Sequence, residues 1–231
     1  MEISRNTNTC RTLLTAFFLI LLLPSAATAQ GRVSIGIHFD PLIGWFGTDI
    51  SAVNNDGARP GINAGLSLKL PFSSNYSFST GLNLINAAGR LVCNTETVLE
   101  LVNNETVAAN EPVVYKIQYI AVPLGLKLQT NQIGYLTFFS DVGLDPKVII
   151  GGKADIPSLS LKGEKANNEL KMFNLSYHVM AGIEYGLGGN TAAVVGIGFE
   201  NNFLDVTKDN GTQPVDKVTH RLVSVRLGVN F

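Results

Sequence analysis

The stretch FNLSYHVMAGIEYGL, residues 173–187, decides the fold class because it alternates along its whole length. Its odd-numbered positions are apolar, and its even-numbered positions are polar or small apart from Met180. Successive side chains of a β-strand point to opposite faces, so a period of two predicts a strand with one apolar and one polar face. This strand is longer than the roughly five or six residues that are usual in globular proteins.

The same alternation recurs in seven further segments, which makes eight expected strands. They are residues 33–39, 62–70, 76–84, 120–129, 135–144, 193–200 and 223–231. Three links are tight turns rich in Pro, Gly, Asn or Ser, at residues 71–75, 130–132 and 188–190. Four links are long, at about residues 47–57, 91–111, 152–172 and 204–218. This succession places both ends of the chain on the side of the short turns.

Together these features predict an all-β fold, an eight-stranded antiparallel up-and-down transmembrane β-barrel with short periplasmic turns and long extracellular loops. Membrane strands need about 9–11 tilted residues, and outer-membrane barrels have an even number of them. The apolar faces carry almost no charge, and the opposite faces are rich in Gly, Ser and Asn, which suits a narrow polar interior. The last segment ends on Phe231, similar to the recognition signal of bacterial outer-membrane proteins. The alternative is a secreted soluble barrel that binds a small ligand.

Composition excludes some other classes of protein. The chain has 231 residues, of which 45% are hydrophobic and 15% charged, with a net charge of −1. Disordered chains have few apolar residues and a high net charge, and nucleic-acid binders need a basic excess to neutralise phosphates. We therefore expect a folded chain and no nucleic-acid partner.

The first residues predict export. A positively charged start precedes the apolar stretch 13–23, and the small residues Ala27 and Ala29 follow it. This is the pattern of a secretory signal peptide, and the apolar stretch is short for a spanning helix. We expect cleavage to remove residues 1–29, leaving a barrel domain of residues 30–231 in the bacterial outer membrane. An uncleaved anchor is the alternative.

Residues 119–127, YIAVPLGLK, resemble a motif of the PorT-like outer-membrane β-barrels of Bacteroidetes, members of the outer membrane protein beta-barrel domain family. The family pattern is roughly Tyr-Leu-Glu-Ile-Pro-Leu-Leu-Leu-Lys, and Ala121 stands where it often has Glu, so a role of that carboxylate is not carried over. The resemblance implies an outer-membrane location and an eight-stranded barrel. Most members have no assigned activity, although PorT itself is associated with a protein-secretion system. Pro123 removes a donor from the strand ladder, and we expect a bulge there.

The polar faces of the strands supply a set of charged side chains inside the expected barrel. They are Lys69, Lys127, Asp141, Glu184, Glu200 and Arg226, with His38, Asp40 and His178 on the same faces. Side chains can fill the interior of an eight-stranded barrel, and charges enclosed there must pair. We therefore expect a structural polar network in the lumen, and a proton or ion path is the alternative.

No sequence motif indicates catalysis, a cofactor or a metal. The three histidines lie in strands without a Ser/His/Asp arrangement at short spacing, and Gly-x-Ser-x-Gly, His-Glu-x-x-His and cysteine-pair motifs are missing from the sequence. His38 and Asp40 share a strand face at a spacing compatible with metal ligation, but a hydrogen-bonded pair is the favoured interpretation. We expect a protein that is not an enzyme.

The expected function is an outer-membrane barrel with a filled polar lumen, a structural or interaction scaffold that presents extracellular loops as part of an envelope or secretion assembly. The alternatives are a small pore or transport-related barrel and the soluble barrel named above. Expected partners are outer-membrane lipid and an unidentified envelope protein or surface glycan. We expect residues 97–102 to form a short helix or to extend the strands. Aromatic girdles are expected from Trp45, Tyr76, Tyr135, Tyr177 and Tyr185, with packing inside the barrel as the alternative for Tyr135.

Overall fold

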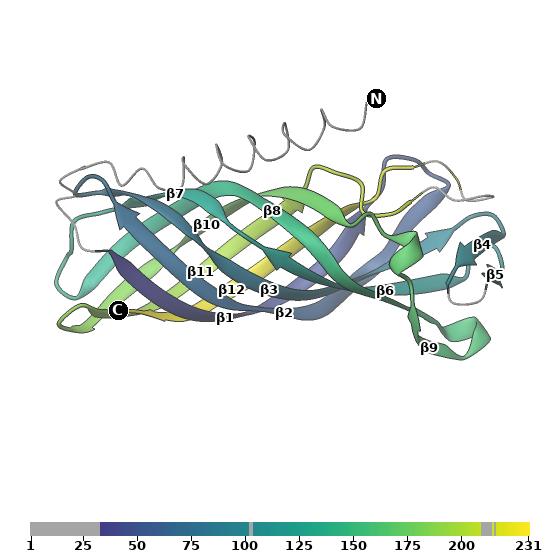
Figure 1. The fold of residues 1–231 in the computed structure, drawn as a ribbon, viewed down its shortest axis with the longest axis horizontal. Helices are drawn as coiled ribbons and strands as arrows, with labels where there is room; N and C mark the ends of the chain where they lie inside the picture. Colours follow the sequence, from purple (N-terminus) through teal and green to yellow (C-terminus); the bar gives the residue numbers. More distant parts are fainter. Residues whose placement is uncertain (1–32, 102–103, 209–213, 215) are drawn as a thin grey trace, which may run out of the picture.

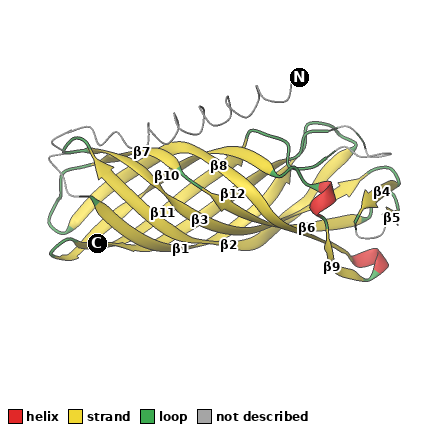
Figure 2. Ribbon diagram, in the orientation of Figure 1, coloured by secondary structure: helices red, strands yellow, loops and turns green. Residues whose placement is uncertain are grey.

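A computed structural model describes residues 33–101, 104–208, 214 and 216–231 of the chain. Long antiparallel strands wrap around one axis, with a short-turn end and a long-loop end (Figure 1). Two single turns of 3₁₀ helix lie in the loop after the eighth strand, η1 (Pro157–Leu159) and η2 (Asn167–Glu169) (Figure 2). The strands are β1 (Ser34–Gly47), β2 (Val53–Pro71), β3 (Tyr76–Cys93), β4 (Thr97–Glu100), β5 (Asn104–Val107), β6 (Pro112–Ala121), β7 (Leu124–Gln129), β8 (Leu136–Ile156), β9 (Leu161–Lys165), β10 (Phe173–Gly188), β11 (Thr191–Asn202) and β12 (Thr219–Asn230).

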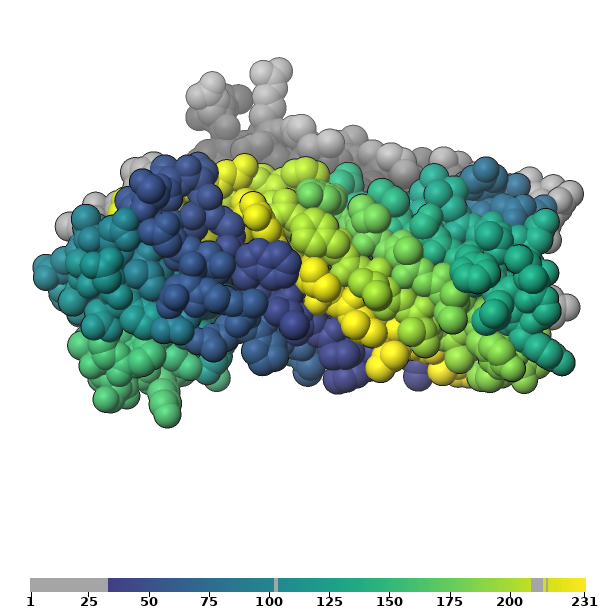
Figure 3. Space-filling view, turned by 180° about the vertical axis from the view of Figure 1, so that it is seen from behind, coloured from purple at the N-terminus to yellow at the C-terminus, as the bar shows by residue number. Residues whose placement is uncertain are grey.

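The strands close into a ring of eight positions, as predicted. The order around the ring is β1, β2, β3, β6 together with β7, β8, β10, β11 and β12. β6 and β7 share one position because each pairs with β3 on one side and with β8 on the other. The ring closes where β12 pairs with β1, and the two lie side by side in purple and yellow in Figure 3.

The apolar faces of the strands point outward and the polar faces point into the lumen. Ile37 is 53% exposed, Val179 45% and Leu227 46%, whereas the neighbouring inward-facing residue His38 is buried. A soluble barrel would show the reverse. This arrangement is the one that a lipid-facing barrel requires, since closure pairs every strand edge and lipid covers the apolar surface.

Aromatic side chains gather on the outside at the short-turn end. Tyr76, Tyr135 and Tyr185 are exposed there, and the rings of Tyr135 and Tyr185 lie 5.9 Å apart. The alternative that Tyr135 packs inside the barrel is wrong, because it lies in the turn before β8 with 67% of its surface exposed. Trp45 and Tyr177 are partly exposed and lie nearer the long-loop end.

The strands extend further at the long-loop end than expected. β1 and β2 are separated by residues 48–52 alone, so the long loop expected at 47–57 is wrong. The short helix or strand extension expected at 97–102 is wrong for the described part of that segment, because Thr97–Glu100 form β4, which pairs with β5 in a separate two-stranded hairpin. We call β4 and β5 the cap hairpin. The loop after β8 contains η1, β9 and η2, and β9 pairs with the far end of β8.

The bulge expected at Pro123 is also wrong. Asn83 lies opposite Ala121 and Thr80 lies opposite Leu124, so the two strands advance by the same number of residues across the proline. The strand keeps its register although Pro123 offers no N–H, because the neighbouring Val122 N–H still donates to Pro146 O at 3.0 Å. The irregularity lies instead in β8, at Ile150.

An apolar core fills the barrel near the long-loop end, so the expectation of a polar lumen holds for only part of its length. Phe46, Ile85 and Ile117 are almost fully buried there. The cap hairpin adds Leu99 and Val107 to the same cluster. At this end the strands extend beyond the lipid-facing zone. Their inner faces bury apolar side chains against one another, as in the core of a soluble domain. No helix in the described ranges is long and apolar enough to cross a membrane.

Candidate functional site: the polar lumen

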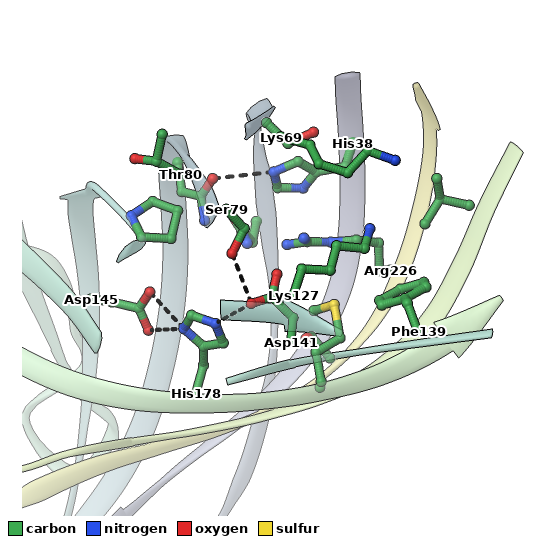
Figure 4. A pocket seen from close by; sticks show the side chains of 18 of the residues that line it. His38, Lys69, Ser79, Thr80, Lys127, Phe139, Asp141, Asp145, His178 and Arg226 are labelled. Atoms are coloured by element: carbon green, nitrogen blue, oxygen red, sulfur yellow. Dashed lines mark hydrogen bonds and ion pairs between the residues drawn. The ribbon is translucent and has the colours of Figure 1, made fainter. Parts of the chain in front are cut away.

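On the short-turn side of the apolar core, charged and polar side chains line the lumen around a cavity of about 90 Å³ (Figure 4). Inward-facing residues of β1, β2, β3, β7, β8, β10, β11 and β12 contribute to its lining. Strand alternation explains why so many polar groups meet here, since every second residue of each strand must point inward. They form three neighbouring clusters.

Glu184 is the centre of the cluster nearest the short-turn end. Its carboxylate accepts hydrogen bonds from Lys127 Nζ at 2.6 Å and from Lys69 Nζ at 3.4 Å. The side-chain amides of Gln129 and Asn230 donate to it at 2.9 and 3.1 Å. Two cations and two amides therefore surround one buried carboxylate, and the cluster bears net positive charge.

Asp40 is the centre of the second cluster and is fully buried. Arg226 Nη2 donates to its Oδ2 at 2.9 Å, and the amide of Asn63 donates to the same oxygen at 3.1 Å. His38 Nδ1 lies 3.0 Å from Asp40, and its other ring nitrogen lies 3.1 Å from Asn83 Oδ1. His38 and Asp40 form a pair within a hydrogen-bonded network.

The third cluster places His178 between two carboxylates. His178 Nδ1 lies 2.9 Å from Asp145 Oδ1, and Nε2 lies 3.5 Å from Asp141 Oδ1 (Figure 4). Ser79 Oγ donates to Asp141 at 2.8 Å. The ring fits because Gly143 stands opposite it, where a Cβ would come within 2.7 Å of the imidazole.

Lys147 joins the polar lumen to the apolar core. Its ammonium group pairs with Glu200 and lies 4.9 Å from the centre of the Tyr119 ring. Tyr119 OH is in turn 3.0 Å from His220 Nδ1 in a fully buried contact. Ser176 Oγ donates to Glu200 at 2.9 Å, which gives that carboxylate a second partner.

The structure places all six sequence-predicted residues on the lumen side, and it brings some of them together with residues outside that set. Lys127 pairs with Glu184, while Arg226 pairs with Asp40, which lies 186 residues away in the sequence. Glu200 pairs with Lys147, which lies beyond the end of the strand expected at residues 135–144.

Asp145 and Lys147 were missed because the expected strand ended at Leu144. The period of two continues from Asp141 through Asp145 to Lys147, and this was the signal that could have found them. Tyr119 and His220 had no such signal, since their contact depends on how two distant strands approach one another.

The arrangement holds the charges of the described lumen residues in pairs and hydrogen-bonded clusters. Ser79 donates to a carboxylate, and both nitrogens of His178 face carboxylates, so this histidine is not placed as a base for that serine. Among the described residues, no group of three or more His, Cys, Asp or Glu side chains could hold a metal ion.

The sequence matches one family of proteins by its family model. Residues 27–188, more than half of the chain, match the family model described as outer membrane protein beta-barrel domain. The chain belongs to this family. No curated protein matches it.

Several solved structures are similar to the chain at low identity. Neisserial surface protein A is 10% identical, with 86% of this chain and 95% of that chain covered and a TM-score of 0.49. The outer membrane protein OprG from Pseudomonas aeruginosa is 11% identical, with 89% and 98% covered and a TM-score of 0.46. The outer membrane protein AlkL is 15% identical, with 90% and 92% covered and a TM-score of 0.48.

The family together with the closed ring defines an outer-membrane β-barrel protein. Its outward apolar faces are in contact with membrane lipid, and its long-loop end is extracellular. The alternative of a secreted soluble barrel is therefore excluded.

Proposed function

We propose that the protein is a closed scaffold in the outer membrane that neither conducts ions nor catalyses a reaction and that presents its extracellular loops to a partner. One observation carries this proposal: between the vestibule at the short-turn end and the long-loop end, side chains occupy the lumen, first as paired charges and then as an apolar core. Toward the short-turn end, Glu184 and Asp40 form ion pairs with cations inside the lumen. Toward the long-loop end, Phe46 and Ile117 fill the lumen.

The cap hairpin supports the proposal from the extracellular side. Leu99 and Leu101 are buried in the core, so this hairpin is packed against the end of the barrel. A loop fixed in this way is a preformed surface, which lowers the entropic cost of binding a partner. The partner proposed for this surface is an envelope protein or a surface glycan.

A small pore remains the competing function because the lumen is open at the short-turn end. A vestibule of about 350 Å³ lies there, lined in part by Lys69, Gln129 and Glu184. The test is single-channel recording of the purified barrel in planar bilayers. The scaffold predicts no stable conductance, in the wild type and in Lys127→Ala alike. Steady current steps whose size changes with Lys127→Ala would establish the pore instead.

Absence of catalysis belongs to the same proposal. Its support is that the titratable groups of the lumen are engaged with one another, and the cavity between them is about 90 Å³, too small for a substrate of ordinary size. The test is incubation of the folded barrel with phospholipid and peptide substrates. Turnover that survives purification and disappears on unfolding would overturn it.

We also propose that the chain is a PorT-like barrel of a Bacteroidetes bacterium and takes part in an envelope or secretion assembly. The motif at 119–127 supports this, since Tyr119 and Lys127 both have defined contacts in the lumen. Crosslinking of the extracellular loops in intact cells tests the assembly, and recovery of the barrel alone would contradict it.

Removal of residues 1–29 is a further part of the proposal. That segment lies outside the described residues, so its support is the sequence pattern alone. Intact mass measurement of the protein from the outer membrane tests it. The expected mature protein begins at Gln30, and a mass that includes the first 29 residues would contradict cleavage.

A further inference from the structure

Three lysines stand in one row across the outside of the barrel near the extracellular end. Lys116 of β6 is directly opposite Lys153 of β8, and Lys153 is directly opposite Lys165 of β9. The three strands lie side by side (Figure 1). Like charges placed directly opposite on neighbouring strands repel each other, so this lysine row destabilises the isolated sheet. An anion bound beside the row would offset this repulsion.

The protein supplies only part of that compensation. Lys116 forms an ion pair with Asp155, two positions beyond Lys153 on the same face of β8. Within the described part of the chain, Lys153 and Lys165 have no carboxylate within ion-pair distance, and both are exposed. Two positive charges of the row therefore face outward without a counter-charge.

The lysine row borders a groove of about 550 Å³ on the outer wall. Gly151, beside the bulge in β8, presents no side chain to the groove, and Gln118 and Asn167 add polar groups to its lining. Ile150 lines the same groove and is 51% exposed. The groove thus combines an apolar, lipid-facing side chain with free ammonium groups.

The position of the groove along the barrel axis indicates which kind of molecule it can bind. Below the groove, Ile120 and Val148 continue the exposed apolar surface that contacts lipid. The lysines therefore stand at the upper border of the hydrocarbon zone, where lipid headgroups carry their phosphates and where lysine side chains extend to reach the polar layer.

We propose that this groove binds a phosphate-bearing lipid of the outer leaflet, with the acyl chains along Ile150 and the headgroup phosphate on Lys153 and Lys165. Both parts of the ligand have a matching surface: the apolar chain continues the lipid-facing wall, and the anion neutralises the lysine row. A free phosphate ion would satisfy only the second part.

The test measures binding of lipid A to the folded full barrel in zwitterionic micelles, alongside lipid A whose phosphates have been removed and alongside inorganic phosphate. Lysine near a membrane surface contributes about fivefold in affinity for an anionic headgroup. We expect intact lipid A to bind at least tenfold more tightly than the dephosphorylated lipid. Inorganic phosphate at millimolar concentration should not displace it.

Two variants locate the site. Lys153→Gln with Lys165→Gln should lower the affinity for lipid A to that for the dephosphorylated lipid. Lys162→Gln is the matched control, because Lys162 lies in the same strand β9 and is exposed but does not line the groove. It should change the affinity less than twofold.

Three results would overturn the proposal. Equal affinity of the wild type for both lipids would show that the phosphates are not recognised, and this comparison does not depend on any variant folding. An equal loss in Lys162→Gln would show general electrostatic attraction. Displacement by inorganic phosphate would show a free-anion site.

Discussion

At the residue scale, each buried charge of the lumen has a specific hydrogen-bonding or ion-pair partner. Lys127 is an example: its ammonium group contacts Glu184 and also lies 4.0 Å from the centre of the Phe139 ring. An ion taken out of water loses several kcal/mol of hydration, which only close pairing and hydrogen bonding recover. The paired charges therefore stabilise one another, and removal of any one of these side chains should destabilise the barrel.

Glu184→Gln should destabilise the barrel by about 3 kcal/mol, because it leaves Lys127 and Lys69 enclosed without their shared carboxylate. The measurement is the urea midpoint of unfolding from phospholipid vesicles. Glu96→Gln, at an exposed loop position, is the control and should leave the midpoint unchanged. Equal midpoints for the two variants would show that the pairing contributes little.

Asp155 should titrate at unusually low pH. Partial burial raises the pKa of Asp155, but hydrogen bonds from Lys116 and Gly163, together with the charges of Lys116 and Lys162, hold it below 3.8. The stabilisation of the β8–β9 hairpin by this carboxylate is therefore complete above about pH 4 and is lost as the pH falls through the lowered pKa.

The readout is the amide resonance of Gly163, whose N–H donates to Asp155 Oδ1 at 2.8 Å. Its NMR shift should follow the titration with a midpoint below 3.8 and lose that dependence in Asp155→Asn. A midpoint at or above 3.8 would contradict these contacts.

At the element scale, the alternation of the sequence predicts the strands and their faces well, because lipid on one side and the lumen on the other impose a strict period of two. It predicts the strand ends poorly. Beyond the lipid zone the outer face meets water and the inner face packs an apolar core, so the alternation weakens where β3 and β8 continue. The pairing of β4 with β5 in the cap hairpin was not predicted for the same reason.

The cap hairpin should protect Cys93. The thiol lies in a small pocket with Thr97, Leu99 and Val107, and burial raises its pKa. Since the thiolate is the reactive form, labelling of the folded protein by a maleimide at pH 7 should be slow.

Leu99→Asp should loosen the hairpin and speed this labelling at least tenfold, since a charge cannot remain in the apolar core. Thr106→Asp, exposed on the same hairpin, is the control and should leave the rate near that of the wild type. Rapid labelling of the wild type itself would show that the hairpin does not cover the barrel end.

At the scale of the whole molecule, the barrel has three zones along its axis: an open vestibule, a charged lumen and an apolar core under the cap hairpin. The sequence predicts which charges point inward, because that depends only on whether a residue falls on the odd or the even positions of its strand. It does not predict which charges meet, because that depends on the tilt and stagger of strands around the closed ring. The pairing of Arg226 with Asp40 depends on the β1–β12 closure, and the position of Lys147 depends on the length of β8.

The central claim is that the chain forms a closed barrel which spans the outer membrane. The most direct measurement compares the gel mobility of the outer-membrane fraction in SDS before and after boiling. A closed barrel keeps its fold in cold SDS, so we predict a band that changes position on heating. The same mobility before and after heating, with the protein recovered in the soluble fraction, would contradict the account.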